Sequence, residues 1–157
     1  MICSNVSGKG ESISAYSTNT TQFKDCKLLL AALAEMGFDA SKVEVNENPK
    51  QLYDFQGRQT HYVDAEGDKA NVIIRRQFVG GAANDIGFKR NADGTFDAFL
   101  SAYDRRCGYD EQWLGKLTAA YARNAIMQKA QKQGLRFAGT VKLANGKTQL
   151  RFLDVRG

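Results

Sequence analysis

Pairs of basic residues interrupt the middle of the chain, and paired cationic side chains can hold an anion with bidentate geometry. The three pairs are Arg75-Arg76, Lys89-Arg90 and Arg105-Arg106. We expect all three near one edge of a single sheet, where they would form an anion pocket. The alternative is a set of salt bridges with the nearby acids, which are Asp85, Asp97 and Asp104.

The first of these pairs is the most constrained. Arg75 and Arg76 fall on an expected central strand, where successive side chains point to opposite faces of the sheet. One of them therefore points the same way as Val72 and Ile74, toward the expected core. An arginine in that position costs free energy unless it is paired or opens onto a cavity.

Basic residues are concentrated at the C-terminal end of the chain. Residues 112–157 contain nine Lys or Arg and one acid, Asp154, which gives +8, whereas residues 1–111 contain 13 basic and 16 acidic residues, which gives −3. The whole chain of 157 residues carries +5. Such an asymmetry is typical of a surface that faces an anionic partner; the alternative is a solvated basic face that only maintains solubility.

Patterns for catalysis or metal binding are weak. His61 is the single histidine, and Cys3, Cys26 and Cys107 are far apart with no CxxC pair, which argues against a zinc site and a disulfide framework. Cys107 follows two arginines, which would lower the pKa of its thiol. No partner base is evident for either residue, so an enzyme that uses His61 or Cys107 is a lesser alternative, and no metal or cofactor is predicted.

A run of small residues, Val79-Gly80-Gly81-Ala82-Ala83-Asn84, follows the expected strand. Its backbone N–H groups would be able to approach a phosphate. The run matches neither GxxxxGK[ST] nor GxGxxG, so a simple turn is the favoured interpretation.

Two amphipathic helices are expected to support these residues. The first spans residues 22–36, with Thr20 or Thr21 as its cap. The second spans residues 111–133, with Asp110 as its cap. Its first apolar stripe contains Trp113, Leu117, Ala120 and Tyr121. A second stripe, formed by Ala119, Ala122, Ile126 and Ala130, is either buried in the fold or offered to a partner protein or a second copy.

Asn124 lies within the first stripe of the second helix. A buried amide must be hydrogen-bonded, so Asn124 either stabilises the core or contributes to a pocket. Tyr121 and His61 are the other candidates for that pocket.

Alternating apolar residues predict strands between and after the helices. One strand runs through Val72 to Phe78, and a hairpin joins residues 86–90 to residues 96–100. Shorter strands are expected at residues 11–17, 42–46 and 59–64.

The final segment predicts a hairpin with a two-residue type I′ turn at Asn145-Gly146. In that register Lys142 and Arg151 occupy neighbouring rows of the outward face. The opposite face should cover the core with Phe137, Val141, Leu143, Leu150 and Phe152.

Together these elements predict an α+β fold with one mainly antiparallel sheet and two helices packed on it. The composition, with 43% hydrophobic and 25% charged residues, suits a single domain over residues 1–157, with residues 1–10 as a candidate N-terminal arm. No apolar run approaches the roughly 18 residues of a membrane helix, and no secretory signal is visible. A cytoplasmic protein that does not contact membranes is expected.

Several segments resemble one family in their order and spacing. These are Asn84-Asp85-Ile86-Gly87-Phe88, Leu114-Gly115-Lys116-Leu117-Thr118-Ala119-Ala120-Tyr121-Ala122 and Lys132-Gln133-Gly134-Leu135, together with Met36-Gly37-Phe38 and Phe55-Gln56-Gly57-Arg58-Gln59-Thr60. They are similar to the hypothetical chloroplast reading frame thirty-five family of plastids, bacteria and phages. The resemblance covers residues 14–153 and implies a small soluble protein with no assigned catalytic residues.

This sequence departs from that family at its N-terminus and at Asn124, where family members often carry histidine. Because asparagine cannot titrate near neutral pH, the departure argues against proton transfer at that position.

Charge and resemblance together favour a non-enzymatic protein that binds an anion. The ligand would be a nucleotide-like small molecule, as in a phage protein that sequesters a nucleotide signal, or a nucleic acid. Its candidate residues are Arg75, Arg76, Lys89, Arg90, Arg105, Arg106, Lys142 and Arg151. The main alternative is an interaction subunit or homo-oligomer that docks through the second helix.

Overall fold

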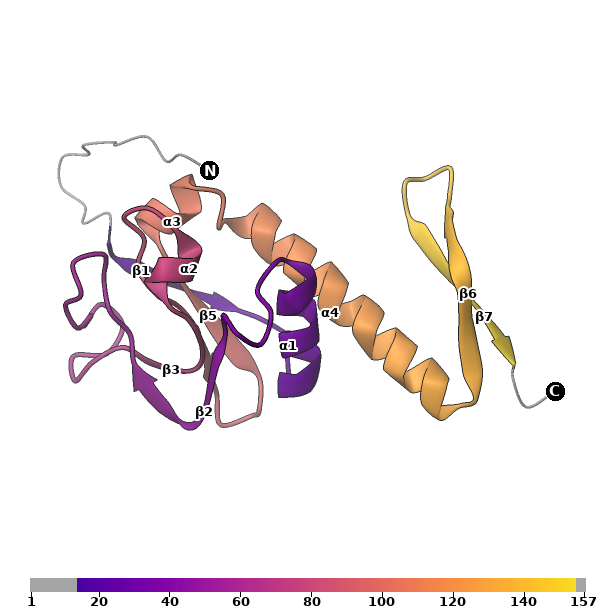
Figure 1. The fold of residues 1–157 in the computed structure, drawn as a ribbon, viewed down its shortest axis with the longest axis horizontal. Coiled ribbons are helices and arrows are strands. Elements are labelled where there is room, and N and C mark those ends of the chain that lie inside the picture. Colours follow the sequence, from indigo (N-terminus) through magenta and orange to yellow (C-terminus); the bar gives the residue numbers. More distant parts are fainter. Residues whose placement is uncertain (1–13, 155–157) are drawn as a thin grey trace.

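The computed structural model describes residues 14–154, which form seven strands and four helices (Figure 1). In chain order these elements are β1 (Tyr16–Thr20), α1 (Cys26–Glu35), β2 (Glu44–Gln51), β3 (Lys69–Ile74), α2 (Arg76–Val79), β4 (Ile86–Arg90), β5 (Phe96–Ser101), α3 (Ala102–Arg106), α4 (Glu111–Lys132), β6 (Leu135–Lys142) and β7 (Thr148–Asp154). The candidate arm at residues 1–10, Cys3 and Arg156 lie outside the described residues.

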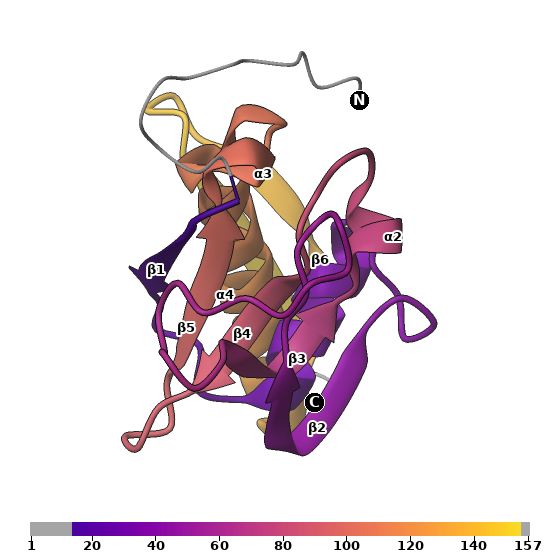
Figure 2. The same ribbon diagram turned by 90° about the vertical axis from the view of Figure 1, so that its left-hand side faces the viewer.

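Five strands form one antiparallel sheet in the order β1-β5-β4-β3-β2. Figure 2 shows β1 and β2 at its two edges. The sheet and its helices confirm the α+β class. They differ from the expectation of two helices, because two short helices, α2 and α3, follow β3 and β5.

The strand expected through Phe78 ends at Ile74 instead. The next residues turn into α2, because the Asp85 carboxylate accepts a hydrogen bond from the backbone N–H of Arg76 at 2.7 Å. Arg75 and Arg76 therefore do not occupy a central strand, and the argument from opposite sheet faces is wrong for this pair.

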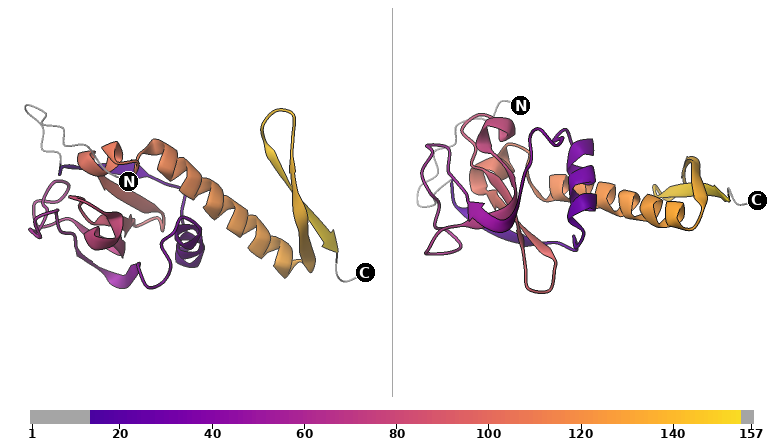
Figure 3. Two further views of the ribbon diagram at one scale, coloured as in Figure 1. Left: turned by 45° about the horizontal axis from the view of Figure 1, so that its top comes forward. Right: turned by 60° about the horizontal axis from the view of Figure 1, so that its bottom comes forward.

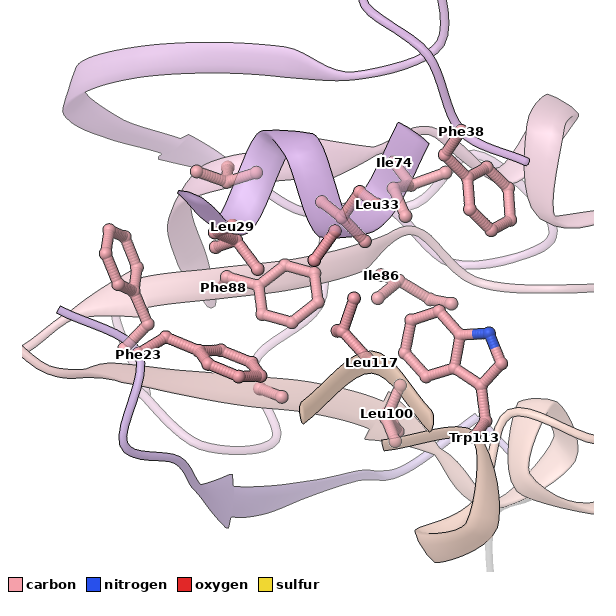
Figure 4. Close-up of a cluster of buried hydrophobic side chains, with 14 of the residues drawn as sticks. Phe23, Leu29, Leu33, Phe38, Ile74, Ile86, Phe88, Leu100, Trp113 and Leu117 are labelled. Carbon is pink, nitrogen blue, oxygen red and sulfur yellow. The ribbon is translucent and has the colours of Figure 1, made fainter. Parts of the chain in front are cut away.

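The main hydrophobic core lies between the sheet and two helices. Leu29 and Leu33 of α1 and Leu117 of α4 are fully buried against sheet residues that include Ile74 and Phe88 (Figure 4). At about 25 cal/mol per Å², burial of such side chains contributes roughly 1.5–3 kcal/mol each. The expectation that both helices pack on one face is confirmed for α1 and α4.

The opposite face of the sheet is covered by the loop between β2 and β3. Leu52 from this loop packs with Ala70, Ile73 and Phe99 of the sheet. The loop itself is organised by the buried Asp68, whose carboxylate accepts hydrogen bonds from three backbone N–H groups, those of Tyr62, Val63 and Asp64. These side chain–backbone bonds replace a ladder, so the expected strand at residues 59–64 is wrong apart from a bridge at Gln59.

Capping residues define the helix ends. Asp110 caps α4 as expected, whereas α1 is capped by Asp25 and not by Thr20 or Thr21. The Tyr121 hydroxyl also accepts hydrogen bonds from the backbone N–H groups of Lys24 and Asp25, at 3.1 and 2.9 Å. Tyr121 thereby ties α4 to the start of α1.

The last two strands form a separate two-stranded sheet. In Figures 1 and 3 this hairpin stands at the far end of α4, away from the five-stranded sheet. The main contact of β6 outside the hairpin is with α4. The expectation that one face of the hairpin covers the main core is therefore wrong.

Gly87 in β4 permits a close approach between the sheet and the loop above it. A Cβ at this position would lie 2.8 Å from the Ala70 Cβ and 2.9 Å from the Leu52 Cδ1. We expect Gly87→Ala to lower the free energy of unfolding by about 1–3 kcal/mol through overpacking, measured by urea denaturation.

Gly115 of α4 provides the matched control, because a Cβ added at this position would have no other atom within 4 Å. Gly115→Ala should raise the free energy of unfolding by up to about 1 kcal/mol through helix propensity. A Gly87→Ala variant as stable as the unsubstituted protein would contradict the packing described for β4.

Candidate functional site

Arg75 is held in an ion-pair network. Its guanidinium donates to Glu44 at 2.8 and 2.9 Å, to Asp85 at 2.9 Å and to the backbone oxygen of Gln51 at 3.0 Å. The two carboxylates raise the pKa of Arg75 well above its usual value, and hydrogen bonding to Arg75 lowers the pKa of Glu44. With its donors engaged by acids, Arg75 is a structural residue and leaves no charge for a ligand.

The other members of the basic pairs are dispersed. Arg105 bonds to Glu111 and to the Ser17 hydroxyl, and Arg76 donates to the backbone oxygen of Phe55 at 2.7 Å. The Arg90 guanidinium lies 5.0 Å from the centroid of the Phe96 ring.

Strand register separates the pairs further. Ile74 at the end of β3 pairs with Ile86 at the start of β4, so Lys89 and Arg90, at the end of β4, lie at the other end of the sheet from Arg75. Exposed Arg106 lies on α3, which follows the end of β5. The structure therefore does not bring the three pairs together.

Two of the residues suggested for a pocket, Tyr121 and Asn124, are neighbours on α4, whereas His61 lies in the loop between β2 and β3, which covers the opposite face of the sheet. His61 is exposed, and its Nδ1 lies 3.2 Å from the backbone oxygen of Ala65. Asn124 donates to the backbone oxygen of Ala120 one turn earlier in α4, at 2.8 Å, which satisfies part of its amide. The Tyr121 hydroxyl caps α1. Because His61 lies across the sheet from α4, the three residues do not form a common site.

The cysteines differ from expectation at one position. Cys107 is disulfide-bonded, so its sulfur is not the reactive thiol considered from the sequence. Cys26 is a free, partly buried thiol whose pKa is raised by burial.

Basic residues most strongly outnumber acids in one region, the C-terminal arm, which we define as residues 126–154 and in which Asp154 is the single acid. Its basic residues are all exposed, and none forms an ion pair with another described residue; they are Lys129, Lys132, Arg136, Lys142, Lys147 and Arg151. Nearer the body, Arg123 is neutralised by Glu35 of α1. The charge excess of the sequence is thus concentrated on a projecting element.

The register of the arm's hairpin differs from the predicted one. Gly146 has φ 83° whereas no described residue other than glycine has a positive φ, so Asn145 does not adopt the conformation that a type I′ turn requires. Leu143 instead pairs with Lys147 around a three-residue loop, and Lys142 pairs with Thr148.

This one-residue shift changes which side chains share a face. Arg136 and Arg151 lie on one face, while Lys142 lies on the other with Leu150 and Phe152. The expectation that Lys142 and Arg151 share one outward face is therefore wrong, although both residues remain exposed.

An apolar groove of about 410 Å³ adjoins these cations. It lies between the end of α4 and the hairpin and is lined by Met127, Gln131, Leu135, Arg136, Phe137 and Phe152. The rings of Phe137 and Phe152 pack edge to face with their centroids 5.8 Å apart, and Phe137 is 41% exposed.

A second cavity, of about 140 Å³, lies at the other end of the molecule, beside α2 and α3. Gly80, Gly81 and Ala83 line one side, and Tyr103, Asp104 and Tyr109 are among the residues on the other. The small-residue run noted in the sequence thus forms a cavity wall. The cavity contains a carboxylate, which disfavours the phosphate considered for this loop.

Asp104 is fully buried, and neither of its carboxylate oxygens has a hydrogen-bond partner among the described residues. Burial raises the pKa of Asp104 to about 7, against a smaller lowering by the Ser101 hydroxyl and the backbone of Asn84, which lie nearby without completing hydrogen bonds. In the sequence this residue was recognised only as a salt-bridge partner for arginine. No local sequence pattern predicts that Asp104 is buried in α3 without a described partner.

The matched family model spans residues 32–151, which is most of the chain, and is described as a protein of unknown function, DUF1257. The chain belongs to the DUF1257 family. The match begins within α1 and ends within β7, so it includes both the cavity beside α3 and nearly all of the C-terminal arm of this DUF1257 protein. No curated protein and no solved structure matches the chain.

Two kinds of feature are not found in the described part of this DUF1257 protein. Within residues 14–154 no three His, Cys, Asp or Glu side chains are grouped to hold a metal ion. No helix in the same range has both the length and the apolar character needed to cross a membrane.

Asp104 predicts an unusual pH dependence of stability. Between the unfolded pKa near 3.9 and the folded pKa of about 7, the folded state retains a proton that the unfolded state has lost. Stability is therefore lost as the pH rises through this interval. We expect Asp104→Asn to stabilise the protein by roughly 2–4 kcal/mol at pH 8, measured by urea denaturation.

The gain should shrink as the pH falls toward 4 and vanish below it, where the unsubstituted side chain becomes neutral in both states. Asp97→Asn, which removes an acid from the partly exposed side of β5, serves as control and should show no such pH-dependent gain. A pH-independent effect of Asp104→Asn would mean that the carboxyl group is not unpaired in the folded protein.

Proposed function

We propose that this protein binds nucleic acid through its C-terminal arm and prefers single strands. The observation that carries the proposal is the exposure along the arm of six cations that form no ion pair within residues 14–154, with Asp154 as the arm's single acid. Phosphate backbones bind such surfaces by releasing condensed counterions.

The spacing of the cations supports an extended polyanion over a compact nucleotide. They extend from the last turns of α4 to the hairpin loop, and each strand of the hairpin spans roughly 23–26 Å. The arginine pairs that would have formed a compact anion pocket are apart, and Arg75 and Arg105 are held by acids. A protein that sequesters a single nucleotide is therefore less well supported.

The apolar groove supports the preference for single strands. Phe137 is exposed beside Arg136, and unstacked bases pack on aromatic rings and on the planes of guanidinium groups. Duplex bases are already stacked and would gain nothing from this contact.

We also propose that the protein is a member of the chloroplast reading frame thirty-five family and that it comes from a phage. That family resemblance implies a small soluble protein with no assigned catalytic residues, and nucleic-acid binding by the arm requires no catalysis.

A second candidate function is docking through α4. Ala119, Ala122 and Ile126 are exposed, and Ile126 is 48% accessible, so this apolar stripe is available to a partner protein or a second copy. Light scattering distinguishes self-association: Ile126→Lys should convert an oligomer to a monomer, and a monomeric unsubstituted protein would rule out the second copy.

We expect binding to a single-stranded oligonucleotide to weaken steeply with salt, measured by fluorescence anisotropy. Arg136→Gln/Arg151→Gln removes two cations from one face of the hairpin. If both contact phosphates, the slope of log K against log salt should become shallower by about 1.4, since each contact to a single strand contributes about 0.7.

The matched control is Lys24→Gln/Lys27→Gln, which removes the same charge from exposed positions at the start of α1. It should leave the slope unchanged. Equal effects of the two double variants would show that only net charge matters, and absence of binding at low salt would reject the proposal.

A further inference from the structure

Negative charge at the cavity beside α3 is not compensated by any described residue. None of the described residues that line the cavity is basic, and both oxygens of Asp104 lack partners. Asp85, the neighbouring buried acid, has its own partners in Arg75 and backbone N–H groups.

The same negative field acts on nearby groups. Burial raises the pKa of Tyr16 well above its usual value, and the carboxylates of Asp85 and Asp104 raise it further. Asp104 also contributes to the raised pKa of Tyr109. An uncompensated carboxylate in such a place is costly, and a cation that enters the cavity would remove the cost.

Aromatic side chains favour an organic cation. Tyr103 and Tyr109 both line the cavity, and aromatic rings attract ammonium groups through the negative charge of their faces. The Tyr109 hydroxyl donates to the backbone oxygen of Val79 at 3.1 Å, which fixes this side chain across the cavity wall.

Size and ligand number argue against a metal ion. The cavity of about 140 Å³ has room for several atoms, since about 10–15 Å³ on this measure is enough for one water molecule. A divalent metal ion would need several oxygen or nitrogen ligands, and Asp104 is the single acid among the described residues that line the cavity.

We propose that the cavity formed by Gly80, Gly81, Tyr103, Asp104 and Tyr109 binds the ammonium group of a small organic amine. The ammonium group faces Asp104, whose buried carboxylate turns toward the cavity to accept hydrogen bonds from it. The short alkyl part lies against the small residues of the 79–83 loop. Gly80 and Gly81 have φ of 113° and 56°, and Gly80 has open space where a side chain would begin.

Ethylammonium chloride is the probe for a thermal unfolding test. At equal ionic strength it should raise the Tm of the unsubstituted protein more than potassium chloride does, because a ligand that binds the folded state stabilises it by mass action. Ethanol, the neutral analogue, should have no such effect. The increase should disappear in Asp104→Asn and persist in Asp97→Asn.

A second measurement needs no variant. The carboxyl carbon of Asp104, followed by NMR, should titrate at a lower pH when ethylammonium is present, because a bound cation favours the ionised carboxylate. An unchanged midpoint would overturn the proposal. It would also be overturned by an equal rise in Tm in Asp104→Asn, or by potassium acting as well as ethylammonium, which would mark a site for inorganic cations.

Discussion

The buried Asp85 carboxylate is the interaction on which the arrangement of this protein depends. It accepts hydrogen bonds from the backbone N–H groups of Tyr53 and Arg76, at 2.8 and 2.7 Å, and from the Arg75 guanidinium. These bonds join the loop after β2 and the start of α2 to the residue that precedes β4. Loss of one partner would leave a buried charge uncompensated, which typically costs about 3–5 kcal/mol. Because Asp85 also fixes where the 79–84 loop begins and ends, it determines the wall of the cavity that contains Asp104.

Sequence reasoning succeeded where the signal is local. The β4–β5 hairpin, the Asp110 cap and the apolar faces of α1 and α4 follow from spacing alone, and together they are enough to predict an antiparallel α+β fold. Sequence reasoning failed where a residue distant in the chain determines the local structure. The alternation of apolar and polar residues continues past Ile74. The strand nevertheless ends there, because the Asp85 carboxylate accepts a hydrogen bond from the Arg76 backbone N–H at the start of α2. The hairpin turn was predicted from Asn145-Gly146, yet a single left-handed glycine shifts the register by one residue.

The candidate sites were predictable to different degrees. The charge of the C-terminal arm is a property of composition, and it remains on the surface because few acids lie close to it. The arginine pairs were indistinguishable from ligand-binding residues in the sequence, because Glu44 and Glu111 reach Arg75 and Arg105 only after folding. Asp104 was hidden for the opposite reason. Its type suggested a salt bridge, and only the tertiary structure shows that its oxygens have no partner within residues 14–154.

The two proposed sites have opposite charge and lie at opposite ends of the molecule (Figure 1). The cations of the arm are exposed, so salt screens them over a Debye length of about 8 Å at physiological ionic strength. The Asp104 carboxylate is enclosed, and screening by salt reaches a buried charge far less. Ionic strength therefore separates the two activities without any substitution. Nucleic-acid binding should weaken as salt rises, while occupancy of the cavity should depend on the chemical identity of the cation and on the protonation of one carboxyl group.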